Sequence, residues 1–149
     1  MENKKFNIRV YGLLIDERKI LVSDEFRLGM FMTKFPGGGL IYGEGLAECL
    51  KREFMEELNL GISILSHYYT TDFFVASKHL PVEYQLINVY YRVQAEKPYP
   101  FTTTDKKFDF AEVVDGAQCF RWVPIAELTE EEFTFPIDKF IVNKLKADF

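Results

Sequence analysis

The sequence predicts an α/β protein in which helices cover a mixed β-sheet, with residues 1–149 forming a single domain. Segments with strand periodicity lie before and after an amphipathic helix, and a second amphipathic helix ends the chain. The composition is 48% hydrophobic, with no segment too polar to fold. A chain of this length buries roughly two-thirds of its unfolded surface, so one core is sufficient.

The first elements form a predicted hairpin followed by a glycine-rich loop. Phe6–Ile15 alternates as a strand does, Asp16–Arg18 is a polar connection, and Lys19–Ser23 is a second short strand. A loop containing Gly29 leads to Lys34–Gly39, where three glycines follow a proline. We expect these glycines to exclude regular structure and to let the backbone approach a ligand closely.

Leu46–Leu58 is predicted to be a helix because apolar residues recur at four-residue spacing. These residues are Leu46, Leu50, Phe54 and Leu58. Asn59 follows at the position where helices often end in a left-handed residue, a conformation that asparagine tolerates well.

The second half is predicted to contain more strands, a long loop and a final helix. Ile62–Val75 and Val82–Val93 are rich in β-branched and aromatic residues, which favours two long strands. Lys97–Gly116 has prolines and carboxylates without periodicity, which indicates a loop. Ala117–Val123 is a last strand, and an amphipathic helix starts after Pro136.

Overall charge and cysteine content exclude several classes of protein. A net charge of −5 argues against nucleic acid as a partner, because coating a polyanion requires basic surface. Cys49 and Cys119 fit neither a disulfide framework nor a zinc site, so reduced core thiols are expected. No apolar segment is long enough for a signal peptide or a membrane span, so we expect a cytoplasmic protein with no membrane partner.

Some residues with reactive or aromatic side chains have ordinary structural interpretations. We expect His67 and His79 to be polar strand or loop residues, and Trp122 to be an anchor in the core or sheet. Three basic residues could meet substrate phosphates but are expected to be solvated at the surface: Arg9, Arg27 and Lys34.

The helix carries three carboxylates that indicate a cation site. Glu53, Glu56 and Glu57 stand at i, i+3 and i+4, so they project toward one region and repel one another unless a cation is bound. Carboxylates are hard oxygen ligands, so Mg²⁺ or Mn²⁺ is expected rather than zinc. Mg²⁺ completes its coordination with water and phosphate oxygens, which indicates a phosphate-containing substrate.

Arg52 lies beside these carboxylates and is expected to hold one of them in place. Its side chain can reach Glu48 or Glu56, each one turn away, or can orient Glu44 across the preceding loop.

The segment from Gly37 to Leu60 resembles the Nudix box, G-x5-E-x7-R-E-U-x-E-E-x-G-U, where U is a bulky apolar residue. Its sequence is GGGLIYGEGLAECLKREFMEELNL. The matching positions are Gly38, Glu44, Arg52, Glu53, Phe54, Glu56, Glu57 and Leu60. Asn59 replaces the usual glycine and Phe54 the usual aliphatic residue. Neither departure removes a carboxylate, and asparagine can adopt the positive φ that glycine usually has at this position.

The resemblance implies an α/β/α sandwich fold and a divalent-metal-dependent hydrolase in which water attacks a diphosphate. By position, Glu53, Glu56 and Glu57 would be metal ligands, and Arg52 would orient the catalytic group. The implied substrate-binding residues are Gly37, Gly38, Gly39 and Glu44. The proton acceptor varies in such enzymes, so we expect either Glu53 or a loop carboxylate, first Glu112 and then Glu96 or Asp109.

The expected substrate is a small nucleoside diphosphate linked to another group, such as a nucleotide sugar or ADP-ribose, or else a nucleoside triphosphate. Two alternatives stay open: a Nudix-like module that senses a nucleotide without cleaving it, and an RNA-end pyrophosphohydrolase. The presence of every box glutamate argues against the first, and the acidic net charge argues against the second. The family resemblance also suggests a homodimer.

Overall fold

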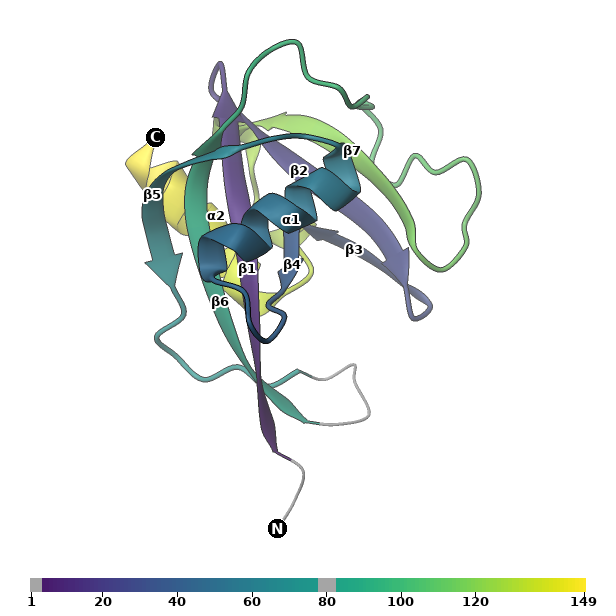
Figure 1. Cartoon of the computed structure of the whole chain (residues 1–149). Helices are drawn as coiled ribbons and strands as arrows, with labels where there is room; N and C mark the ends of the chain where they lie inside the picture. Colours follow the sequence, from purple (N-terminus) through teal and green to yellow (C-terminus); the bar gives the residue numbers. More distant parts are fainter. Residues whose placement is uncertain (1–3, 78–82) are drawn as a thin grey trace.

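A computed structural model describes residues 4–77 and 83–149 (Figure 1). Its strands are β1 (Lys5–Asp16), β2 (Lys19–Arg27), β3 (Met30–Lys34), β4 (Gly37–Gly39), β5 (Ser63–Thr70), β6 (Tyr84–Gln94) and β7 (Ala117–Pro124). Its helices are α1 (Leu46–Leu58) and α2 (Pro136–Asp148), with short 3-10 turns η1 (Ile125–Glu127) and η2 (Glu130–Glu132) between β7 and α2.

The long strand β1 organises a mixed sheet. It pairs in parallel with β6 along most of its length and antiparallel with β2 and β4. On either side, β5 extends the sheet beyond β6, while β3 and β7 both pair with β2. Strands far apart in the sequence therefore meet around β1 and β2.

Two helices cover opposite faces of this sheet. Figure 1 shows α1 crossing in front of the strands and α2 behind them. Alternate residues of β1 point to opposite faces of the sheet. Val10 and Leu14 pack in the hydrophobic cluster on the α1 side, whereas Tyr11 and Leu13 pack in the cluster on the α2 side. The predicted α/β/α sandwich with a mixed sheet is confirmed.

The predicted first hairpin is present, and a second one was missed. Glu17 and Arg18 form the β1–β2 turn, both with positive φ. The region around Gly29, predicted to be a loop, is instead a hairpin in which Leu28 and Gly29 form the turn between β2 and β3. Gly29 suggested a loop, whereas its positive φ of 73° places it in the tight turn of a hairpin.

The expectation that the three glycines exclude regular structure was wrong. Gly37–Gly39 forms β4, which pairs with residues Arg9–Tyr11 of β1. At Gly37, φ is +146° and an added Cβ would lie 2.1 Å from the Val10 carbonyl oxygen. The missing side chains permit the close approach of the two strands, so glycine here enables strand pairing.

The remaining elements follow the predictions with shifted boundaries. β5 ends at Thr70 and not at Val75, and residues 97–116 form the predicted long loop. Val82 and His79 lie outside the described residues. Trp122 packs against the α1-side core next to Tyr99, as predicted for an anchor. In the described part of the chain, no helix is long and apolar enough to cross a membrane.

Candidate active site

Helix α1 occupies the predicted residues and turns its polar face toward β4. Its buried face carries Cys49, Leu50, Phe54 and Leu58. The backbone N–H of Gly45 at its start donates to the Glu48 carboxylate, and Asn59 ends it with φ of 52°. Glu53 and Glu57 are half-buried at the edge of this buried face, with Glu53 against the glycine strand, whereas Glu56 is exposed.

Arg52 is the centre of the ionic contacts on this face. Its guanidinium lies 2.7 Å from Glu44, 3.0 Å from Glu53 and 3.2 Å from Glu56, and it donates to the Gly39 carbonyl oxygen at 3.1 Å. The predicted contacts with Glu44 and Glu56 are present, whereas Glu48 turns back to cap the helix. One guanidinium thus connects the helix to the loop and to β4.

Glu44 is fixed from two sides. It accepts hydrogen bonds from Arg52 and from the backbone N–H of Ile41, which lower its carboxyl pKa to about 2. The loop that joins β4 to α1 is therefore held by a carboxylate that is ionised at neutral pH.

Glu53 lies directly against Gly38. A Cβ added to Gly38 would lie 2.5 Å from the carboxylate carbon of Glu53, a distance at which one of the two residues must shift. Since Arg52 holds this carboxylate on one side, the absence of a side chain at Gly38 leaves the space that it occupies. Gly38 therefore determines where Glu53 lies.

Glu57 points inward, away from Arg52. Its Oε1 accepts a hydrogen bond from Gln118 at 3.3 Å, while its Oε2 is buried without a hydrogen-bond partner among residues 4–77 and 83–149. Burial raises the pKa of this carboxyl to about 7; nearby Lys34 lowers it and Glu25 raises it further. A buried oxygen without a partner is costly unless it has another ligand.

The three box glutamates do not converge as their spacing suggested. Arg52 binds Glu53 and Glu56, the side chain of Glu56 is 58% exposed, and Glu57 faces inward. Over the described ranges, no three acidic, histidine or cysteine side chains form a ready cation cage. The donor chemistry still fits a hard divalent cation, because Glu57 offers an unpartnered buried oxygen beside Glu53.

A cavity of about 540 Å³ opens beside these carboxylates. Gly37–Gly39, Glu53 and Glu57 line one end, and β1 contributes Arg9 and Tyr11. The cavity continues to the start of α2, where Asp138 contributes to its wall. The glycine strand and two of the α1 glutamates therefore face one space large enough for a small ligand.

The far end of the cavity holds a buried polar network. Tyr90 donates to Asp138 at 2.6 Å, and the Asn88 amide donates to the Tyr90 hydroxyl at 3.2 Å. Asn88 and Asp138 both line the cavity, and the Asn88 Oδ1 is buried with no hydrogen-bond partner in the described part of the chain. This end of the cavity can accept hydrogen bonds from a ligand.

Two basic residues predicted to be solvated at the surface are inside the site. Lys34 is only 7% exposed and forms an ion pair with Glu25 at 3.2 Å. Arg9 lines the cavity, and its Nε donates to the Tyr11 hydroxyl. The expectation failed for these two because both lie in paired strands beside the cavity, Arg9 opposite Gly39 of β4 and Lys34 opposite Ser23 of β2. Arg27, by contrast, has a side chain that is 52% exposed at the rim.

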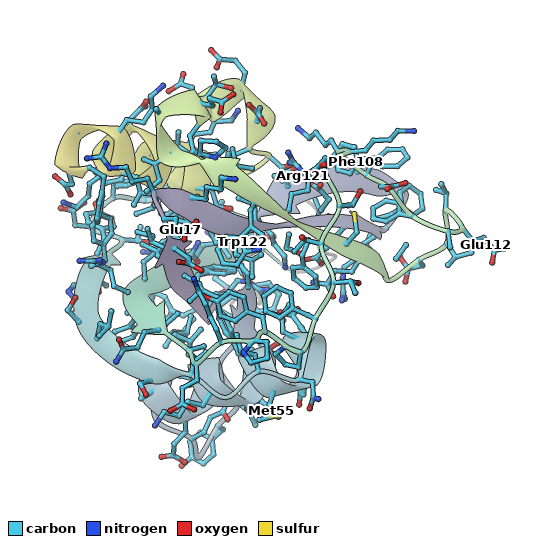
Figure 2. The ribbon with its side chains drawn as sticks, turned by 90° about the horizontal axis from the view of Figure 1, so that it is seen from above. Glu17, Met55, Phe108, Glu112, Arg121 and Trp122 are labelled. Atoms are coloured by element: carbon cyan, nitrogen blue, oxygen red, sulfur yellow. The ribbon has the colours of Figure 1, made fainter. Side chains whose placement is uncertain are left out.

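The loop carboxylates lie elsewhere. Figure 2 shows Glu112 at the outer tip of the loop that follows β6, well separated from Met55 of α1. Glu112 is exposed and does not line the cavity. Asp109 accepts a hydrogen bond from Thr104, and Glu96 lies beside a separate surface groove. The structure brings Glu53, but none of these three, to the cavity.

Because Asp138 is buried, we expect the stability of the protein to depend on pH. Its pKa is raised to about 6 from 3.8, mainly by desolvation, so the native state binds a proton that the unfolded chain releases above pH 4. The free energy of unfolding should therefore fall as pH rises from about 4 to 6. With Asp138→Asn this contribution, at most about 3 kcal/mol, should disappear.

Urea unfolding between pH 4 and pH 8 measures the effect. We expect the variant to gain stability relative to the parent across the window from 4 to 6 and to keep a constant margin above it. Parallel curves throughout would show that Asp138 is ionised at the same pH in both states.

Residues 5–143 match the family model of the NUDIX domain. The chain belongs to the Nudix family. The match includes the glycine strand, α1 and most of α2, so it extends well beyond the box itself. The Nudix chain matches no curated protein sequence.

Solved structures of Nudix proteins share this fold. A NUDIX hydrolase from Nitrosomonas europaea is 18% identical, with a TM-score of 0.66 and coverage of 97% of this chain and 90% of that one. A MutT NUDIX hydrolase from Burkholderia pseudomallei is 14% identical, with a TM-score of 0.70 and coverage of 95% and 98%. A MutT protein from methicillin-resistant Staphylococcus aureus 252 is 22% identical, with a TM-score of 0.65 and full coverage of both chains. At these identities the likeness shows the fold.

Sequence reasoning missed the residues that complete the site from outside the box. These are Glu25, Asn88, Gln118 and Asp138. Asp138 had a faint signal, since it stands in the first turn of a helix among apolar residues, but acidic residues are common there for reasons of helix capping. The other three lie within strands, where nothing distinguishes them from solvated polar residues.

Proposed function

We propose that this Nudix hydrolase uses a divalent cation to cleave the diphosphate linkage of a small nucleoside diphosphate derivative, either a nucleotide sugar, ADP-ribose or a nucleoside triphosphate. The observation that carries the proposal is the unpartnered, buried Oε2 of Glu57 in a cavity shared with Glu53 and the glycine strand. Carboxylate oxygens are ligands for a hard cation, and the glycine backbone beside them lets a diphosphate approach closely, so the same cavity can hold both.

Mg²⁺ or Mn²⁺ is the proposed cofactor, held by Glu53, Glu56 and Glu57. Such a cation neutralises phosphate charge and activates water when bound. Glu53 and Glu57 already line the cavity, while Glu56 is bound by Arg52. Arg52 keeps its orienting role through Glu44 and the Gly39 carbonyl oxygen.

The substrate is proposed to lie along the cavity, with its diphosphate against Gly37, Gly38 and Gly39 and Glu44 supporting this loop. Arg9 and Lys34 supply positive charge on the same wall, which suits phosphate oxygens. The nucleoside end then reaches the acceptors of Asn88 and Asp138. For the proton acceptor we favour Glu53 over Glu112, because Glu53 borders the cavity.

A panel assay with purified protein tests the proposal. Substrates would be nucleoside triphosphates, nucleotide sugars, ADP-ribose and dinucleoside polyphosphates, each with Mg²⁺ and then Mn²⁺. We expect cleavage that EDTA abolishes and that Glu57→Gln removes. Binding without cleavage across the panel would favour the nucleotide-sensing module, and cleavage confined to triphosphorylated RNA would favour the RNA-end enzyme.

The compartment and assembly are part of the same proposal. The two thiols are unpaired, with Cys49 buried, which is consistent with a reducing cytoplasm. We also propose that residues 1–149 form a single domain. We further propose that the chain forms a homodimer, and a monomeric mass by light scattering at micromolar concentration would contradict this. A membrane partner is not expected.

The contact between Gly38 and Glu53 predicts a loss of activity in Gly38→Ala. The added methyl group must displace the Glu53 carboxylate, and misplacing a catalytic group by about 1 Å can cost about 10²-fold in rate. We therefore expect kcat/KM to fall by about that factor in steady-state assays. Gly61→Ala is the matched control, because a Cβ there meets nothing within 4 Å. Equal activity in both variants would show that the position of Glu53 is unimportant.

A further inference from the structure

Gln118 connects β7 to the carboxylates of the site. It lies opposite Glu25 in the antiparallel pairing of β7 with β2. Its amide nitrogen is 2.9 Å from the Ser23 hydroxyl and 3.3 Å from both Glu25 Oε2 and Glu57 Oε1. An amide nitrogen carries two hydrogens, so this group is shared among three acceptors, two of which are carboxylates.

Glu25 is a rigid anchor for this amide. Its side chain is 1% exposed, and it is paired with Arg27 at 3.0 Å and with Lys34 at 3.2 Å. The Ser23 hydroxyl also donates to its Oε2 at 2.9 Å. Both oxygens of Glu25 are therefore occupied by cationic or hydroxyl donors. Glu25 fixes the Gln118 amide and has no free oxygen to offer a ligand.

The Gln118 amide also determines the surroundings of the Glu57 carboxylate. Of its two oxygens, Oε1 has Gln118 as a donor, and Oε2 lacks any hydrogen-bond partner within the described residues. Glu57 and the buried Glu25 are also close enough for their charges to repel. Without a donor between them, the Glu57 side chain would turn away from Glu25, and both of its oxygens would move.

We propose that Gln118 is a positioning residue for catalysis, whose amide holds Oε1 of Glu57 against the Glu25 anchor so that Oε2 stays available to a divalent cation. The inference rests on the proposed function, since it assigns Glu57 to the cation. It extends the site to a strand that begins 59 residues after α1 ends, as the bounds of α1 and β7 show. Outer-shell partners of this kind orient ligands and strengthen metal sites.

Metal affinity in the absence of substrate tests the role directly. Mn²⁺ binding to the purified full chain is measured by electron paramagnetic resonance of the free ion, for the parent, Gln118→Met and Gln118→Asn. Methionine keeps the length of glutamine without donors, and asparagine keeps the amide one carbon short. We expect the dissociation constant for Mn²⁺ to rise by about 10- to 100-fold in the methionine variant, with a smaller rise in the asparagine variant.

Controls separate positioning from folding. Gln94→Met makes the same substitution at an exposed position of β6 and should leave Mn²⁺ affinity unchanged. Circular dichroism and thermal melts report whether each variant is folded, and Gln118→Asn provides the measurement if the methionine variant does not fold. Mn²⁺ affinity within twofold of the parent in a folded Gln118→Met protein, or in Gln118→Asn if the methionine variant does not fold, would overturn the proposal.

A double-mutant cycle with Glu57→Gln distinguishes this inference from the proposed function. If Gln118 acts through Glu57, Gln118→Met should have no further effect on Mn²⁺ affinity in the Glu57→Gln background. Loss of affinity in Glu57→Gln but not in Gln118→Met would remove the positioning role alone. Parent-like affinity in Glu57→Gln would instead contradict the assignment of Glu57 to the cation, and with it the proposed function.

Discussion

Replacing Glu57 with glutamine is expected to lower kcat/KM by more than about a hundredfold for whichever diphosphate substrate the panel identifies. Loss of an outer-shell partner alone typically costs about 10- to 100-fold in metal affinity or activity, and Glu57 is assigned to the cation itself. The substitution keeps the size of the side chain and replaces a charged oxygen with a donor. The measurement is steady-state kinetics over a range of Mg²⁺ concentrations, which shows whether added metal restores turnover.

Stability separates this effect from misfolding. Because burial raises the pKa of Glu57 to about 7, its ionised form is unfavourable in the metal-free native state. That penalty develops as pH rises from about 4.5 to 7 and is lost on acidification. We therefore expect metal-free Glu57→Gln to melt at or above the temperature of the parent at pH 8. Glu131→Gln, at an exposed carboxylate, is the control for charge. Normal turnover in a folded Glu57→Gln protein would refute the assignment.

Arg52→Lys should produce the second large loss, about 10- to 100-fold in kcat/KM, the range typical of residues that orient ligands. The guanidinium contacts Glu44, Glu53 and the Gly39 carbonyl oxygen at once through its planar fork. A lysine ammonium is a compact point charge and cannot span the same positions. The positive charge is retained, so the loss measures geometry.

Hydrogen exchange at Ile41 provides a readout independent of activity. Its backbone N–H donates to Glu44 at 2.9 Å, and Arg52 holds that carboxylate from the other side. Exchange at Ile41 should therefore accelerate in Arg52→Lys, while Arg18→Lys in the exposed β1–β2 turn should leave it unchanged. Parent-like kinetics and exchange in Arg52→Lys would show that the ammonium suffices.

Local patterns predicted much of the fold. Helix α1 occupies Leu46–Leu58 as its apolar spacing predicted, and Asn59 adopts the left-handed conformation. The errors came where neighbours in space override local preference. Gly37–Gly39 is a strand only because β1 lies alongside it, and β3 follows a turn whose glycine, Gly29, suggested a loop. Pairing with a distant strand leaves no periodic trace in so short a segment.

Helix α1, the placement of its glutamates and the family could all be read from the sequence, because i, i+3 and i+4 spacing and the box pattern are local properties of one segment. Which carboxylate faces the cavity, and what holds it there, follows from contacts between residues far apart in the sequence. Gln118 and Glu57 are 61 residues apart, and Tyr90 and Asp138 are 48 apart. Such contacts depend on how strands pair and helices pack around β1, and burial then determines which of these groups is charged.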